Sequence, residues 1–233
     1  MDINMDTSRG QFFVLEGIDA SGKTEQFNRL VRRMRAASYN VVEGNFPRYK
    51  ESATYCVNEY LQGRYRKPEA PSLQAMRASV LFAVDRYDAA EKVLQEALEA
   101  GNIVISNRYF ASNLAHQGGK IENEKERKEF YRWLYDFEFR IMGIPKPDLN
   151  IVLHLPAAIS YELAKKRAEA TNKKRDTHES DLSHFEHTEA IYLEIARMFP
   201  DEFAMIECTE RGIFLSRDEI ESRIWGVVSK RLG

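Results

Sequence analysis

The stretch "FFVLEGIDASGKTEQ", residues 12–26, determines how the rest of this sequence is interpreted. An apolar run stops at Gly17, and a second glycine, Gly22, is followed by Lys23 and Thr24. This spacing fits GxxxxGK followed by Ser or Thr, the pattern of a phosphate-binding loop between a buried strand and a helix. Glycines permit the tight turn, and backbone N–H groups then surround a phosphate at the positive end of the helix.

We therefore expect residues 17–25 to bind the phosphates of a nucleotide. Lys23 supplies a positive charge for the β- and γ-phosphates, and Thr24 supplies a hydroxyl group to Mg²⁺. The alternative is a chance match in a tight strand–helix turn. The predicted phosphate-binding residues are Gly17, Asp19, Ala20, Ser21, Gly22, Lys23, Thr24 and Glu25.

Apolar, strand-like runs alternate with helical patterns along the chain. Such alternation predicts a mostly parallel five-stranded sheet with helices on both faces, in one α/β domain spanning residues 1–233. For the helix at 72–100 we expect Ser72 as N-cap and Gly101 as the stop signal. The predicted strands are residues 11–16, 39–44, 102–106, 149–155 and 202–207, and the helices are 23–37, 72–100, 124–142, 157–170, 181–198 and 217–232.

Composition describes an ordinary globular protein. The 233 residues are 43% hydrophobic and carry a net charge of −2, so no overall field favours nucleic acid or an anionic membrane. Cys56 and Cys208 stand far apart without metal-ligand spacing, which indicates reduced structural thiols. The polar start and the short apolar runs lead us to expect a cytoplasmic protein without a membrane partner.

Three further stretches combine arginine with aromatic residues: "NFPRYK", "LFAVDRY" and "SNRYFASNLAHQGGK". Phe82 and Arg86 are four residues apart in a predicted helix, so they share one face and could stack on a base and donate to its edge. Arg48 and Arg108 follow the second and third predicted strands. Because ligands bind beyond the carboxyl ends of strands in such sheets, these stretches should converge with the phosphate-binding loop. Taken singly, Phe82 also fits a helix core, and Arg86 a surface ion pair.

The segment "TNKKRDTHESDLS", residues 171–183, is the most polar of the chain and is either a solvated loop or a lid over the site. Its residues 172–176 read NKxxD, one residue longer than the guanine-reading NKxD of GTPases, and they follow a helix rather than a strand. A GTPase is therefore disfavoured.

The order and spacing of "FFVLEGIDASGKT", "FPR", "LFAVDRY", "NRYFASN", "QGG" and "PKPDLNIVLHL" resemble the thymidylate kinase family of P-loop nucleoside monophosphate kinases. The resemblance covers nearly the whole chain. It implies a P-loop NTPase fold with three α/β/α layers, the reaction ATP + dTMP → ADP + dTDP with Mg²⁺, and a homodimer.

The same resemblance implies roles for individual residues. Asp19 faces the sugar 3′-OH of the acceptor, while Arg48 and Arg108 hold its phosphate. Phe82 stacks on the pyrimidine, and Arg86 donates to its O4. The resemblance adds four further acceptor-site residues, of which the amides at 113 and 117 face the base edge: Ser112, Asn113, His116 and Gln117.

Three positions depart from the family pattern. Asn107 stands where relatives carry an aspartate that helps to organise the Mg²⁺ shell, and His116 where many have an aromatic ring over the deoxyribose. Ala20 stands where one branch has an arginine, which implies catalytic cations from the lid: Lys173, Lys174 or Arg175. Two alternatives stay open: a related nucleoside monophosphate or deoxynucleoside kinase with another pyrimidine acceptor, or a catalytically weak, nucleotide-binding regulatory protein.

Overall fold

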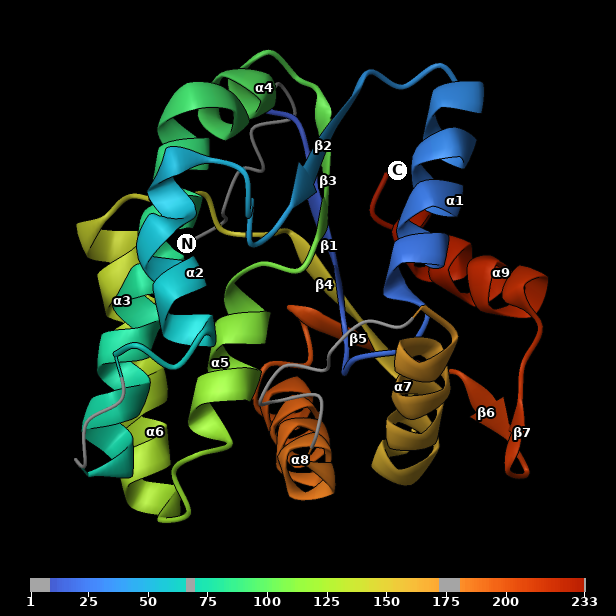
Figure 1. Ribbon diagram of the computed structural model, residues 1–233. Helices are drawn as coiled ribbons and strands as arrows, with labels where there is room; N and C mark the ends of the chain where they lie inside the picture. Colours follow the sequence, from blue (N-terminus) through green and yellow to red (C-terminus); the bar gives the residue numbers. More distant parts are fainter. Residues whose placement is uncertain (1–8, 66–69, 172–180, 233) are drawn as a thin grey trace.

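The computed structural model describes residues 9–65, 70–171 and 181–232. Its centre is a five-stranded sheet in the order β2-β3-β1-β4-β5, in which every neighbouring pair is parallel (Figure 1). Each strand lies within two residues of its predicted position, and the predicted three-layer α/β fold is confirmed. The strands are β1 (Phe12–Glu16), β2 (Val41–Asn45), β3 (Ile103–Asn107), β4 (Leu149–His154) and β5 (Phe203–Glu207).

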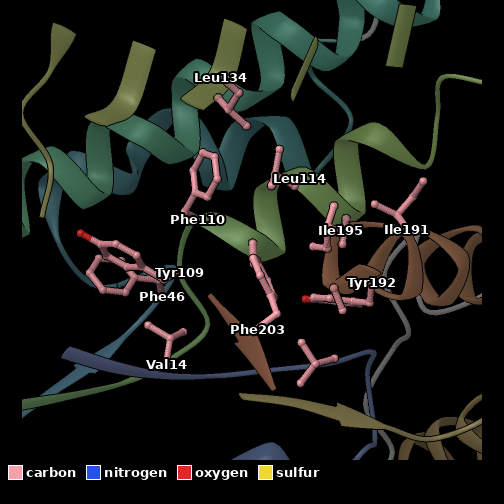
Figure 2. Packing of buried hydrophobic residues seen from close by; sticks show 14 of the residues in the cluster. Val14, Phe46, Tyr109, Phe110, Leu114, Leu134, Ile191, Tyr192, Ile195 and Phe203 are labelled. Atoms are coloured by element: carbon pink, nitrogen blue, oxygen red, sulfur yellow. The ribbon is translucent and has the colours of Figure 1, made fainter. Parts of the chain in front are cut away.

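Helices cover both faces of this sheet (Figure 1). α1 and α9 pack on one face, where Phe13 and Leu15 of β1 join the core. α3, α5, α6 and α8 contribute to the core of the other face, which includes Val14, Tyr109 and Tyr192 (Figure 2). The bounds are α1 (Lys23–Ala36), α2 (Tyr55–Leu61), α3 (Pro71–Ala89), α4 (Gln95–Glu99), α5 (Phe110–Gly118), α6 (Glu124–Tyr135), α7 (Ala157–Thr171), α8 (Leu182–Met198) and α9 (Arg217–Val228).

The two longest predicted helices each contain a π-helical segment. α3 continues through Ala90–Leu94 into α4, and α6 continues through Asp136–Ile141. The prediction of Ser72 as N-cap is wrong, because Pro71 occupies the first turn and Ala70 the N-cap position. Proline suits the first helical residue, where its missing N–H is not needed. Gly101 does follow the end of this helix, with φ of 75°.

Helices α2 and α5 were not predicted, nor was the small antiparallel pair β6 (Thr209–Glu210) and β7 (Ile213–Phe214). α5 lies in a stretch expected to be a loop after β3. Its N-terminal backbone is satisfied from another element, since the Glu16 carboxylate accepts from the N–H groups of Tyr109 and Ser112. A cap supplied by a distant strand leaves no local sequence signal.

Among the described residues, no helix is long and apolar enough to cross a membrane. Both cysteines are free thiols, with Cys56 exposed and Cys208 buried. Of the two cysteines expected to be structural thiols, only Cys208 lies in the core.

His154, at the end of β4, is partly buried and joins three elements. Its Nε2 lies 2.8 Å from an oxygen of Glu189 on α8, and its Nδ1 lies 2.7 Å from an oxygen of Glu207 on β5. Its two ring nitrogens thus both face carboxylates. Burial by itself lowers the pKa of His154, but the hydrogen bonds to Glu207 and Glu189 outweigh it and raise the pKa above 6.5.

This raised pKa predicts a pH-dependent contribution to stability. Protonated His154 stabilises the folded state fully below its unfolded pKa, and the contribution is lost as pH rises through the higher folded pKa. After allowance for solvent screening, wild type should exceed His154→Gln in unfolding free energy by about 1 kcal/mol near pH ~6 and by less near pH ~9. Urea unfolding at both pH values measures the difference, and a gap that widens toward alkaline pH contradicts the assignment.

Candidate active site

The loop of residues 17–24 turns sharply between β1 and α1. Gly17 has φ of 138°, and a Cβ there would lie 2.6 Å from the carbonyl oxygen of Leu153 on β4. Gly22, the N-cap residue of α1, has φ of 88°. Ala20 adopts φ of 60°, which is unusual for a residue with a side chain. The loop therefore ends directly at the N-terminus of a 14-residue helix, where an anion is favoured.

Lys23 lies beneath this loop with 7% of its surface exposed. Its ammonium donates to the carbonyl oxygen of Ile18 at 2.6 Å. Burial, with a smaller effect from Arg108, lowers the pKa of Lys23 to about 7. The nearby carboxylates of Asp19 and Glu16 oppose this shift without outweighing it. A bound phosphate would return the pKa of Lys23 toward its ordinary value. Ser21 Oγ is buried and has no hydrogen-bond partner among the described residues.

Asp19 and Arg108 connect this loop to β3. The guanidinium of Arg108 donates to the Asp19 carboxylate, to Gly17 O at 3.3 Å and to Ser112 Oγ at 3.1 Å. Burial by itself raises the pKa of Asp19, but the charges of Arg108 and Lys23 outweigh it and hold the pKa well below the usual range. Asp19 and Arg108 are therefore both charged at neutral pH, and their charges act on Lys23.

A cavity opens beside this pair. Eight of the nine predicted acceptor-site residues line it, and the structure thereby brings together side chains from the loop, from α3 and from α5. Phe46, Pro47, Tyr49 and Tyr109 add aromatic and apolar surface. The predicted residues in the lining are Asp19, Phe82, Arg86, Arg108, Ser112, Asn113, His116 and Gln117.

Arg48 is the predicted acceptor-site residue that is absent from this lining. Its Nε donates to Asp85 at 2.7 Å, and its Nη2 donates to Asp88 at 2.7 Å and to the Asp85 carbonyl at 2.8 Å. These contacts use the Nε and Nη2 edge of the guanidinium, and Nη1 makes no hydrogen bond to the described residues. Arg48 is therefore anchored by α3, next to the cavity residues Phe46, Pro47 and Tyr49.

Arg86 and Asn113 face the cavity from α3 and α5 and share one buried partner, Glu138. Arg86 Nε donates to Glu138 Oε2 at 2.6 Å and Nη2 donates to Oε1, while Asn113 Nδ2 donates to the same Oε1 at 3.2 Å. Burial opposes the charged form of Arg86, but Glu138 outweighs it and raises the pKa of Arg86. Phe82 meets the ring of Tyr60 edge-on, with 6.0 Å between centroids.

The remaining α5 residues contact other side chains. Gln117 Oε1 accepts from Lys120 Nζ at 2.7 Å and Tyr60 OH at 3.4 Å. The His116 ring stacks on that of His184, with centroids 5.4 Å apart, and its Nε2 lies 3.0 Å from Arg108 Nη1. α8 therefore contacts the cavity-lining residue His116 through His184.

The residues predicted to face a metal differ in their surroundings. Thr24 is exposed in the first turn of α1. Asn107 Nδ2 donates to Asn45 at 2.9 Å, and its Oδ1 is buried with no partner among the described residues. The Glu25 carboxylate is paired with Arg29, so only its backbone remains for a phosphate. The predicted lid cations Lys173, Lys174 and Arg175 lie outside the described residues.

Sequence reasoning missed Glu16, Tyr109, Glu138 and Arg167. Glu16 is fully buried and accepts hydrogen bonds from the Tyr109 N–H at 2.8 Å and the Tyr192 hydroxyl at 2.9 Å. A carboxylate at the end of a buried strand was a signal for Glu16. Glu138 lies among many charged residues of a predicted helix, and nothing in its neighbourhood distinguishes it. Arg167 on α7 is close enough to Lys23 to contribute to its lowered pKa.

Comparisons with known proteins agree on one family. The family model described as thymidylate kinase matches residues 15–220. Curated thymidylate kinases include one from Mycobacterium tuberculosis, 33% identical over 184 residues (78% of this chain and 84% of that protein). Another, from Deinococcus radiodurans, is 28% identical over 96% of this chain and 98% of that protein. A solved thymidylate kinase from Candida albicans superimposes with a TM-score of 0.71 at 20% identity, covering 96% of this chain and 92% of that one.

Proposed function

Because this chain belongs to the thymidylate kinase family, we propose that it transfers the γ-phosphoryl group of ATP to dTMP and forms dTDP and ADP. The observation that carries this proposal is the junction of two sites. The phosphate-binding loop, with Lys23 beneath it, is joined through the Asp19–Arg108 ion pair to a cavity with an aromatic wall and a polar end.

The reaction needs alignment and charge neutralisation rather than a general base. An oxygen of the dTMP phosphate, already ionised at neutral pH, attacks the γ-phosphorus as the bond to the β,γ-bridging oxygen breaks. Two unit negative charges about 4 Å apart repel by roughly 4 kcal/mol at an effective dielectric constant near 20. Lys23 on the donor side and Arg108 on the acceptor side oppose that repulsion. Arg48, with Nη1 unused, is a second cation for the acceptor phosphate.

The acceptor base lies against Phe82 in this proposal, with its polar edge toward Arg86 and Asn113. Arg86, Asn113 and Asp19 all line the same cavity. With the base next to Arg86 and Asn113, the sugar lies next to the Asp19 carboxylate. Gln117 and His116 belong to the same wall of α5, while Ser112 supports Arg108 and is itself bonded to Glu16.

The donor set fits a Mg²⁺ ion that arrives with the nucleotide. Among the described residues no cluster of three or more carboxylate, histidine or cysteine side chains could hold a metal. Thr24 offers one oxygen ligand, and the orphaned Asn107 Oδ1 offers a hydrogen-bond acceptor to the water shell of the ion, which suits Mg²⁺ bound mainly by phosphates and water. When bound, the ion neutralises charge on the phosphates. We further propose that residues 171–183 form a lid that excludes water and supplies Lys173, Lys174 or Arg175 to the phosphates, in a homodimeric cytoplasmic enzyme.

A monophosphate panel tests the function. With ATP and Mg²⁺, the chain should convert dTMP to dTDP with stoichiometric ADP, and it should use dUMP less well and dCMP or thymidine least. Product identity by anion-exchange chromatography separates phosphoryl transfer from ATP hydrolysis. Preferred phosphorylation of thymidine or dCMP would point to a related kinase, and absence of turnover with retained dTMP binding would point to a regulatory protein.

A further inference from the structure

Glu138 is a fully buried acidic residue that takes no part in the chemistry described above. It lies in the π-helical segment Asp136–Ile141, and π-helical segments occur frequently at functional sites. Its two oxygens contact side chains of the acceptor cavity on both α3 and α5. Since burying a carboxylate is costly unless it is fully hydrogen-bonded, its position needs a reason beyond packing.

The contacts of Glu138 fix the orientation of the Asn113 amide. Asn113 Nδ2 donates to Glu138 Oε1 at 3.2 Å and to the carbonyl oxygen of Ser79 at 3.1 Å. Both neighbours are acceptors, so the nitrogen must face them and the oxygen must point the other way. Asn113 Oδ1 is buried and has no partner among the described residues. Asn113 can therefore offer only an acceptor to a ligand in the cavity.

The same carboxylate fixes which donor Arg86 presents. Arg86 Nε and Nη2 are both used by Glu138, and Nη1 makes no hydrogen bond to the described residues. Nη2 of Arg86 and Nδ2 of Asn113 meet at one oxygen, Oε1, so the two groups are neighbours. The pocket thus sets a donor beside an acceptor. That pair complements a carbonyl adjacent to a ring N–H, as in thymine and uracil, and opposes the amino group and bare ring nitrogen of cytosine.

We propose that Glu138 is a positioning residue that sets the hydrogen-bond polarity of the base pocket and thereby selects a pyrimidine with a ring N–H over cytosine. This inference rests on the proposed function, since it assumes a pyrimidine monophosphate as acceptor. Glu138 acts only through Arg86 and Asn113, at a distance from the phosphates. Its effect should therefore appear in discrimination between bases and not in donor binding.

The test compares kcat/KM for dTMP and dCMP in wild type and Glu138→Gln. In Glu138→Gln one carboxylate oxygen becomes an amide nitrogen, which then faces an N–H donor of Arg86 or Asn113. The side chain of Arg86 or of Asn113 must therefore shift. The ratio of kcat/KM for dTMP to that for dCMP should fall about 30-fold, through the KM for dTMP, while the KM for ATP changes less than about twofold. Wild type without turnover on dTMP would reject the proposed function, whereas active wild type with an unchanged ratio in Glu138→Gln would reject this inference alone.

Two further variants separate positioning from folding. Glu138→Asp keeps the charge beside Arg86 and shortens the reach toward Asn113, so the ratio should fall about tenfold in a folded protein. Glu194→Gln is the matched control, because it removes a carboxylate that pairs with Arg127 at 3.0 Å away from the cavity. It should keep the wild-type ratio. If Glu138→Gln does not fold, the Glu138→Asp ratio decides the matter, and a wild-type value there overturns the proposal.

Discussion

Replacing Lys23 with alanine is expected to lower kcat for dTMP by about 10³-fold or more while the chain stays folded. The ammonium is buried under the phosphate-binding loop and makes one hydrogen bond to the described residues, to Ile18 O. Its loss therefore removes little native structure. In the proposed site it removes the charge next to the transferred phosphoryl group, where repulsion between the two nucleotides has to be compensated.

Coupled ADP release with saturating ATP and dTMP measures this loss, and circular dichroism with thermal melting establishes folding. Lys230→Ala is the matched control, because Lys230 is exposed near the end of the chain and should have wild-type turnover. A folded Lys23→Ala protein with wild-type-like kcat would show that the loop does not hold the transferred phosphate.

Replacing Arg108 with alanine is expected to lower kcat/KM for dTMP by about 10²–10³-fold, with a much smaller change in the KM for ATP. In the proposed site Arg108 is the acceptor-side cation, and its guanidinium also donates to Asp19 and to the carbonyl of Gly17. Its backbone has φ of 64°, and in this left-handed conformation its N–H donates to Leu15 O at 2.9 Å and its carbonyl accepts from Ser106 Oγ at 2.7 Å. Alanine leaves the Asp19 carboxylate without its strongest partner, so the KM for dTMP should rise together with a fall in kcat.

Initial rates over a matrix of ATP and dTMP concentrations separate the two KM values. Arg140→Ala serves as control, since Arg140 pairs with Asp136 on the surface and should behave as wild type. Equal increases in both KM values in Arg108→Ala would move this arginine away from the acceptor and toward the shared phosphate site.

Sequence patterns were sufficient for the parts of this molecule that depend on short-range rules. The central strands β1, β3 and β4 are apolar runs because they are buried on both faces of the sheet. The phosphate-binding loop is recognisable in the sequence because few residues can adopt its turns. Phe82 and Arg86 were placed on one face by helical spacing alone, and both line the cavity. These features were predictable because they depend on residues that are neighbours in the sequence.

What could not be predicted depends on contacts between distant segments. Helix α5 begins where the carboxylate of Glu16 supplies its missing acceptor, 93 residues away from Tyr109. Glu138 reaches Arg86 across 52 residues, and only the packed structure distinguishes it from the neighbouring surface acids. Arg48 is anchored by the carboxylates of Asp85 and Asp88 on α3, and no pattern in the residues around Arg48 indicates these contacts.

Glu16 has one more consequence for catalysis. Its carboxylate joins the last residue of β1 to the start of α5 and to Tyr192 on α8. In the proposed site, one buried group therefore connects the donor loop to the wall of the acceptor cavity. The spacing between the two nucleotide sites is then set when the chain folds and not by whichever substrate arrives first. Such a prebuilt spacing favours a random-order kinetic scheme, in which neither nucleotide has to prepare the place of the other.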